Sequence, residues 1–343
     1  MVDRVDVIVR GLVAPWAIDR ARDGRLFLTE RDGRIRTIKD GALEAAPWAT
    51  FTVASRPNDE GGLLGLALDP DFPTNGYAYV YYTYFASNGR RQNRLVRMRE
   101  QDGKGVVDKV LLDGIAGGQL HDGGRVKLGP DGKLYVTVGE AQIESLAQDL
   151  SSPNGKILRL ERDGLIPSDN PFAGSPVWSY GHRHPQGLAW DARGRLYATE
   201  HGPSGLPALG QDCCHDEVNA IEPGGNYGWP FVFGIRGDSR FRDPLLESGT
   251  ETWAPSGATF VTSGPLAGSL LFAALRGTSL DRVVFADDGR SVLFQERLLA
   301  NQYGRFRDVF AMPDGSFLVL TSNRDGRGRP SADDDRVIRV VFR

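Results

Sequence analysis

Polar and charged side chains that could bind an anion and transfer a proton recur at one position of a repeated sequence pattern. Each member of this set stands one to five residues before a strand-like segment: Glu60, His121, Arg183, Thr252, Arg305 and Arg307. Arginine offers a planar fork of hydrogen-bond donors to carboxylates, and histidine can exchange a proton near neutral pH. Several arginines facing one histidine would make a strongly positive pocket, although the chain has a net charge of −3. We therefore expect an anionic ligand and acid–base chemistry at these residues.

The histidines other than His121 give weaker evidence for a functional site. All five histidines lie between residues 121 and 215, and His182 and His184 could place two imidazoles on one face of an extended segment, as a transition-metal site requires. No third and fourth ligands follow at zinc-like spacing, so we expect ordinary loop or supporting roles for the histidines other than His121. GxSxG, Walker and GxGxxG motifs are also missing from the sequence. Their absence removes the usual serine hydrolase, nucleotidase and nicotinamide dehydrogenase classes.

The elements that would position the polar set come from an internal repeat. A strand-like segment, a glycine-containing turn and a second alternating segment recur six times, with turn glycines at Gly24, Gly76, Gly132, Gly194, Gly268 and Gly315. Each unit predicts a β-hairpin, and a lone hairpin is barely stable in water. Further strand-like segments at 34–41, 94–100, 156–164 and 281–289 would complete the units. Four strands in about 50 residues are typical of a propeller blade, which predicts an all-β, six-bladed propeller with four-stranded antiparallel blades around a central channel.

The two ends of the chain provide the signal for ring closure. Segments 5–12 and 335–342 are strand-like and have no hairpin partner of their own. Pairing them in one blade would hide both edges and close the circle. No linker-like stretch divides the chain, which disfavours two separate β-sandwiches. We therefore expect residues 1–343 to form a single domain in which equivalent positions of all blades converge on one axis.

Composition limits the function further. The chain has 43 glycines in 343 residues, which agrees with many turns, and it has no long basic block that would favour nucleic acid as a partner. No apolar run approaches the roughly 18 residues of a membrane span, and the N-terminal residues lack the apolar stretch of a signal peptide. The two cysteines are neighbours, Cys213 and Cys214. We expect a pair of thiols, with a disulfide between neighbours or a bridge between chains as the alternatives.

The residues also carry a family resemblance. The matching stretches span nearly the whole chain in order: 60–72, 121–140, 154–172, 180–191, 200–205, 216–230, 253–257 and 305–309. In these stretches the chain resembles the soluble quinoprotein aldose sugar dehydrogenases of the glucose/sorbosone dehydrogenase family, which use pyrroloquinoline quinone (PQQ). The resemblance implies that His121 is the base that takes a proton from the anomeric hydroxyl, and that Arg183 contacts the quinone oxygens. It implies further that the tricarboxylate cofactor is lined or clamped by Glu60, His184, Thr252, Arg276, Arg305 and Arg307, and that the backbone carbonyls of Gly202 and Pro203 hold calcium.

The same resemblance implies the rest of the reaction. An aldose would be oxidised to its lactone, the electrons would pass to an external acceptor, and the protein would work in the periplasm or outside the cell. His184 stands where the family usually has Asn, and Leu120 stands where glucose-specific members have Asp, so the sugar stays open. The sequence does not indicate the oligomeric state. Two alternatives remain: a non-catalytic propeller that binds a partner, and a calcium-dependent lactone hydrolase. The hydrolase requires acidic or amide side chains in the channel, where this sequence places basic ones.

Overall fold

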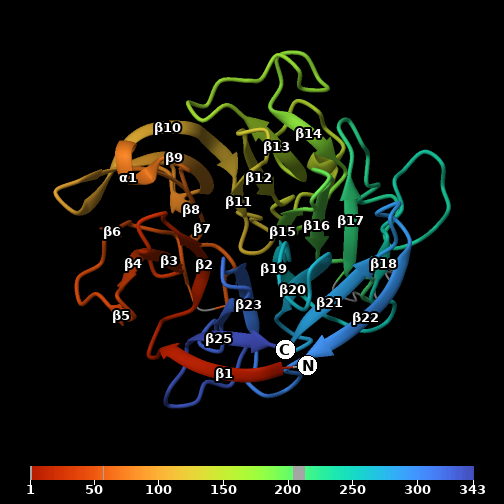
Figure 1. The fold of residues 1–343 in the computed structure, drawn as a ribbon. Helices are drawn as coiled ribbons and strands as arrows, with labels where there is room; N and C mark the ends of the chain where they lie inside the picture. Colours follow the sequence, from red (N-terminus) through yellow and green to blue (C-terminus); the bar gives the residue numbers. More distant parts are fainter. Residues whose placement is uncertain (1, 57, 204–212) are drawn as a thin grey trace.

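Six β-sheets are arranged around a central axis like the blades of a propeller (Figure 1). The computed structural model describes residues 2–56, 58–203 and 213–343. Every blade is antiparallel and begins with its innermost strand, which contacts the innermost strand of at least one neighbouring blade. The predicted six-bladed propeller of four-stranded sheets is thus confirmed.

The first three blades follow one another along the chain. Blade 1 contains β2 (Pro15–Arg20), β3 (Leu26–Glu30), β4 (Arg34–Lys39) and β5 (Ala42–Leu43), and β6 (Ala49–Thr50) also pairs with β4. Blade 2 contains β7 (Leu63–Leu68), β8 (Tyr77–Phe85), β9 (Arg91–Gln101) and β10 (Lys104–Ala116), with the short helix α1 (Phe72–Asn75) between β7 and β8. Blade 3 contains β11 (Val126–Leu128), β12 (Leu134–Val138), β13 (Lys156–Leu160) and β14 (Val177–Tyr180), with the 3-10 turn η1 (Glu144–Ala147).

The last three blades complete the ring. Blade 4 contains β15 (Pro185–Trp190), β16 (Leu196–Glu200), β17 (Glu217–Ile221) and β18 (Leu246–Glu247). Blade 5 contains β19 (Pro255–Phe260), β20 (Ser269–Ala274), β21 (Ser279–Phe285) and β22 (Val292–Leu298). Blade 6 contains β23 (Phe306–Ala311), β24 (Phe317–Thr321), β25 (Val337–Phe342) and, at its outer edge, β1 (Val2–Val9).

The N-terminal strand closes the ring as the sequence predicted. β1 pairs antiparallel with β25, with Val2 opposite Phe342 and Val7 opposite Ile338. The two ends of the chain consequently lie side by side in Figure 1. Blade 6 is therefore built from both ends of the sequence, and its edge strand comes from the first nine residues rather than from the C-terminal segment.

The predicted turn glycines lie between the first and second strands of their blades. All six have a positive φ, between +68° and +98°, which side chains rarely adopt. Gly76 ends α1, Gly268 ends the longer loop between β19 and β20, and the other four lie in tight turns between two strands. The glycine excess of the sequence therefore corresponds to a structural requirement at these hairpins.

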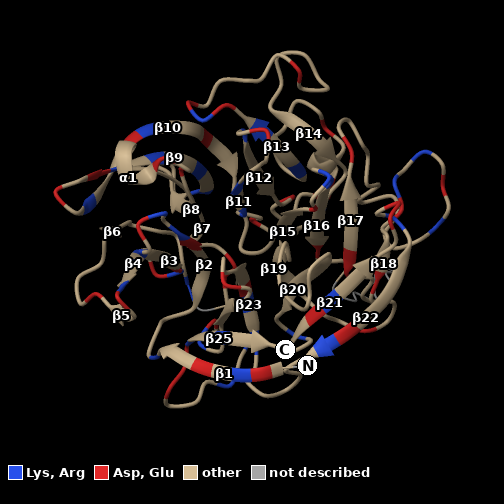
Figure 2. Ribbon diagram, viewed as in Figure 1, with Lys and Arg blue, Asp and Glu red and all other residues tan. Residues whose placement is uncertain are grey.

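The burial of side chains decreases from the central axis towards the outer strands of each blade. The second strands, such as β12 and β24, are buried throughout, whereas the outer strands β10 and β22 expose part of their apolar side chains. Charged residues accordingly mark the outer strands β1, β10 and β22 in Figure 2. Between the inner strands the buried Arg125 donates to Asp308 at 2.9 Å and lies over the Trp16 ring. No helix in the described ranges is long and apolar enough to cross a membrane.

Candidate active site

A cavity of about 340 Å³ lies where the loops that lead into the innermost strands meet. All ten residues singled out by sequence line it: Glu60, His121, Arg183, His184, Gly202, Pro203, Thr252, Arg276, Arg305 and Arg307. Within the described residues the lining contains six arginines but only three acidic residues. The cavity is therefore positively charged, as the recurring arginines predicted.

His121 is fixed by two carboxylates. It stands between β10 and β11 with a left-handed φ of +63°, and its side chain is almost buried. Its backbone N–H donates to Glu60 Oε2 at 2.8 Å, and its ring nitrogen Nδ1 contacts the buried Glu140 carboxylate. A proton on Nδ1 satisfies Glu140 and leaves a lone pair on Nε2, which has no hydrogen-bond partner among the described residues.

His184 and Glu60 form a second contact beside His121. The rings of His121 and His184 have centroids 5.3 Å apart, and His184 Nε2 lies 3.3 Å from Glu60 Oε2. Burial lowers the pKa of His184 well below its ordinary value, so this ring is neutral. Burial would raise the pKa of Glu60, but its contacts with the neutral His184 ring, with His121 and with the Arg327 guanidinium together hold it well below its ordinary value. Glu60 is therefore a carboxylate at neutral pH.

Arg305 and Arg307 reach the cavity from the entry to β23. Arg305 Nε donates to Asp325 Oδ2 at 2.9 Å, and Arg307 Nη2 lies 3.8 Å from the same oxygen. Arg307 Nη1 donates to Gln186 Oε1 at 3.3 Å, while its buried Nε has no partner among the described residues. Burial lowers the pKa of Arg307 to about 9. This guanidinium is held charged with unused hydrogen-bonding capacity, which suits an anionic ligand.

Arg183 lies between β14 and β15, packed over the Trp229 ring at 5.3 Å. Its backbone N–H donates to Glu200, and its Nη1 donates to the carbonyl of His201 at 3.4 Å. Burial lowers the pKa of Arg183, while surrounding carboxylates act in the opposite direction. Neighbouring His182 uses both ring nitrogens within the protein: Nε2 bonds Ser179 at 2.9 Å and Nδ1 bonds Glu200 at 2.8 Å.

Gly202 and Pro203 form part of the cavity wall after β16. The Gly202 N–H donates to Asp216 Oδ1 at 3.0 Å. A Cβ placed on Gly202 would lie 1.9 Å from the carbonyl oxygen of Cys214, so only glycine fits there. Backbone oxygens are hard ligands of the kind that calcium prefers. In the described part of the chain, no group of three His, Cys, Asp or Glu side chains is placed to hold a metal ion.

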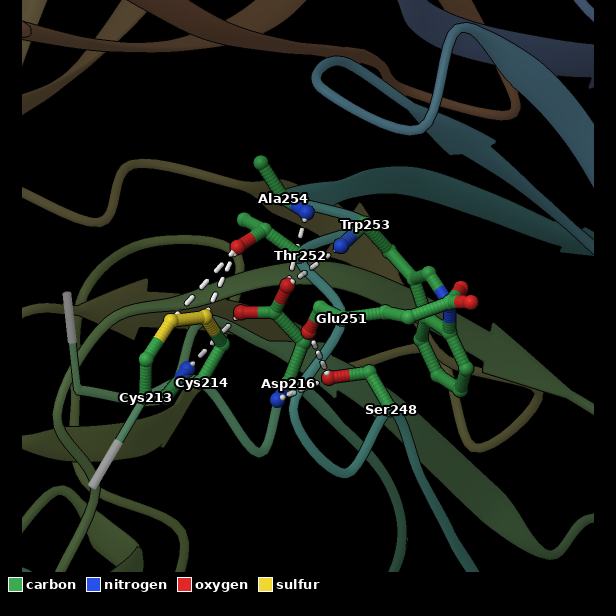
Figure 3. Close-up of a disulfide and its surroundings, with 9 residues drawn as sticks. Cys213, Cys214, Asp216, Ser248, Glu251, Thr252, Trp253 and Ala254 are labelled. Carbon is green, nitrogen blue, oxygen red and sulfur yellow. Dashed lines mark hydrogen bonds between the residues drawn. A yellow bond between two sulfur atoms is a disulfide. The ribbon is translucent and has the colours of Figure 1, made fainter. Parts of the chain in front are cut away.

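Thr252 connects the cavity to the cysteine pair. Cys213 and Cys214 form a disulfide, so the expected pair of thiols is wrong and the alternative of a bridge between neighbours holds. Figure 3 shows Thr252 beside the two sulfurs, and the Asp216 carboxylate directed towards the backbone nitrogens of Trp253 and Ala254. Thr252 Oγ1 donates to Cys214 Sγ at 2.8 Å, and Asp216 accepts the N–H groups of Trp253 and Ala254. Adjacent cysteines in a sequence do not reveal their redox state, because the same spacing allows both forms.

Arg276 lies at the exposed rim of the cavity. It follows β20, and its backbone N–H donates to the carbonyl of Trp253 at 3.0 Å. Arg276 lines the cavity from blade 5. The same blade supplies Thr252, which precedes β19.

Sequence reasoning missed the residues that hold this set in place. These include the lining residues Trp16, Arg31, Gln186, His201, Asp325 and Arg327, and the glutamate behind His121, Glu140. A signal for the glutamate was present in the repeat, because three blades have Glu at or just after the end of the second strand. Glu30 accepts from the N–H of Val13, Glu140 contacts His121, and Glu200 binds the segment entering β15. Each glutamate thus fixes the loop before its own innermost strand.

Several known proteins are similar to this chain in fold and in sequence. The glucose/sorbosone dehydrogenase family model matches residues 12–330. The PQQ-bound structure of aldose sugar dehydrogenase from Streptomyces coelicolor superimposes with a TM-score of 0.87 and is 37% identical, covering 98% of this chain and 97% of that one. Aldose sugar dehydrogenase YliI of Escherichia coli is 31% identical over 94% of this chain and 91% of its own length. Quinoprotein glucose dehydrogenase B of Acinetobacter calcoaceticus is 35% identical over 68% of this chain, which corresponds to 54% of that protein. The chain therefore belongs to the glucose/sorbosone dehydrogenase family.

Proposed function

We propose that this protein is a PQQ-dependent sugar dehydrogenase that oxidises the anomeric hydroxyl of an aldose to a lactone and passes the electrons to an external acceptor. The observation that carries this proposal is the His121–Glu140 pair at the wall of a cavity lined by six arginines. This arrangement places a group that can act as a base next to a binding site for a polyanion. Membership of the family supports the same reaction class.

The residues present fit the cofactor. PQQ carries three carboxylates, and the arginines that would hold them are Arg183, Arg276, Arg305 and Arg307, with Thr252 beside them. The unpartnered Nε of Arg307 supplies a buried donor that an anion would satisfy. The cavity volume of about 340 Å³ lies within the roughly 300–1,000 Å³ of small-molecule sites. When bound, PQQ would supply a quinone that accepts a hydride from the sugar.

Gly202 and Pro203 would supply two backbone carbonyls to calcium. The tight packing of Gly202 against Cys214 excludes a side chain there and leaves main-chain atoms at the cavity wall. A calcium ion held in this way would act as a Lewis acid near the arginines.

His121 would act as the base. Glu140 holds the Nδ1 proton, so Nε2 can accept the proton of the anomeric hydroxyl as the hydride leaves the same carbon. The sugar thereby loses one proton and one hydride and becomes a lactone. Glu140 stabilises the imidazolium that forms, and Arg183 stabilises negative charge that develops on the ligand oxygens.

Reconstitution tests the proposal. Purified apoprotein is titrated with PQQ and calcium, and dye reduction is then followed with a panel of aldoses. We expect saturable PQQ binding and aldose-dependent dye reduction. Failure to bind PQQ at micromolar concentration would exclude the enzyme, whereas binding without turnover of any aldose would favour a non-catalytic propeller.

A further inference from the structure

A segment of blade 6 crosses the rim of the cavity and reaches blade 2. It connects β24 to β25 and is anchored by Asp325, which accepts from Arg305 and from the backbone N–H of Arg327. Gly326 approaches Asn58, where an added Cβ would lie 3.4 Å from Asn58 Oδ1. Within this segment, Arg327 Nη1 donates to Glu60 Oε1 at 2.6 Å. The two residues are 267 positions apart in the sequence.

Both carboxylate oxygens of Glu60 already have partners within the protein. One oxygen accepts the N–H of His121 and faces His184, and the other accepts from Arg327. Its side chain is only 18% exposed. A largely buried carboxylate at the wall of the cavity would repel the carboxylates of a bound polyanion unless a cation offset its charge. His184 is neutral, so it cannot fully offset that charge.

The only arginine among the described residues that forms an ion pair with Glu60 is Arg327. Its side chain is 41% exposed, whereas Arg307 is buried, Arg305 is largely buried, and both are directed towards Asp325. Arg327 thus contributes little to the core and contacts the cavity from the solvent side.

We propose that Arg327 is a positioning residue that neutralises Glu60 and thereby allows a tricarboxylate ligand to bind beside it. This inference rests on the proposed function, which supplies the ligand. Arg327 acts through Glu60, so its effect on ligand affinity depends on the charge of residue 60. Glu60 in turn keeps its contact with the His121 backbone, which holds the base in its left-handed conformation.

A double-mutant cycle with PQQ tests this dependence. Wild type, Arg327→Gln, Glu60→Gln and the double variant are titrated with PQQ in the presence of calcium and without sugar, and the dissociation constants are compared. We expect Arg327→Gln to weaken PQQ binding by about 10- to 100-fold, because it leaves a carboxylate unpaired beside an anion. In the Glu60→Gln background the same change should alter the affinity by less than about threefold.

Two further variants separate charge from structure. Arg327→Lys keeps the charge and should restore most of the affinity. Arg324→Gln is the matched control, because Arg324 lies in the same segment but donates to the carbonyls of Asp334 and Ser331 and does not line the cavity. It should bind PQQ like wild type, and thermal unfolding checks that all variants fold.

The outcomes distinguish the two proposals. Equal losses from Arg327→Gln in both backgrounds, or none in either, would overturn the role of Arg327 while PQQ binding by wild type leaves the proposed function intact. A wild type that does not bind PQQ would overturn both.

Discussion

At the scale of single residues, the site uses a backbone conformation that most side chains avoid. The φ of +63° at His121 is uncommon outside glycine, and such strain persists only where neighbours determine it. Here the Glu60 carboxylate binds the backbone N–H and Glu140 binds the ring. Both the orientation and the tautomer of the His121 ring are thus set before a ligand arrives.

Replacing the ring of His121 while keeping its backbone conformation should separate catalysis from binding. Asparagine tolerates a left-handed φ, so His121→Asn should fold normally. We expect turnover of aldoses to fall by about 10²- to 10⁴-fold, the usual contribution of a general base. The affinity for PQQ, measured by titration, should change by less than about threefold because the arginines remain. Near-normal turnover of this variant would disprove the role of His121.

A neighbouring acid gives a prediction about stability. Burial raises the pKa of Asp122 to about 7, although Asn93 and the N–H of Gly118 donate hydrogen bonds to one of its oxygens and act in the opposite direction. In the unfolded chain the pKa is near 3.9. The folded state therefore holds this proton more tightly, and the contribution of Asp122 to the stability of wild type falls by roughly 4 kcal/mol as pH rises from about 4 to about 7.

Asp122→Asn removes this titration. The free energy of unfolding of the variant relative to wild type should rise between about pH 4 and pH 7 and then level off, since Asp122 is ionised in both states above its folded pKa. Urea unfolding of both proteins at about pH 4 and about pH 8 measures the difference, and the other titrating groups cancel. A difference that is constant or falls with pH would contradict the prediction.

At the scale of elements, local pattern predicted the hairpins well and the contacts between them poorly. The turn at Gly132 follows from residues 125–140 alone, and the structure confirms it. The pairing of Glu60 with Arg327 depends on two blades that meet only when the ring is closed. Their equivalent positions in the repeat predicted that His121 and Arg183 line one cavity. The sequence around each residue did not indicate which carboxylate it would contact.

Two glycines should respond very differently to alanine. Gly65 lies in β7 against β11, and an added Cβ would lie 2.0 Å from the carbonyl oxygen of Gly124. Gly65→Ala must push two innermost strands apart and should lower the free energy of unfolding by at least about 3 kcal/mol. Gly132→Ala has no atom within 4 Å of the new Cβ and should cost only about 1 kcal/mol for its positive φ. Urea unfolding compares them, and equal losses would contradict the close packing of the blades.

At the scale of the whole molecule, the cavity depends on ring closure because five blades contribute its ten predicted residues. β1 supplies the outer edge of blade 6 and covers β25, which otherwise would be an open edge. Deleting residues 1–9 should therefore lower the thermal midpoint and cause association through that edge, seen by size-exclusion chromatography. A truncated chain that stays monomeric with an unchanged midpoint would contradict this.

A circular permutant keeps the same strand pairs and tests whether closure or chain order matters. Val2 lies opposite Phe342, so a short glycine-rich linker can join the ends, and the open turn at Gly132 can take the new ends. Joining the ends links the paired strands β1 and β25 covalently. Opening the turn at Gly132 removes only one hairpin connection. We expect the permutant to fold as a monomer and bind PQQ within about threefold of wild type, since every cavity residue keeps its place. Loss of binding in a folded permutant would mean that the turn at Gly132 holds blade 3, and with it His121, in register.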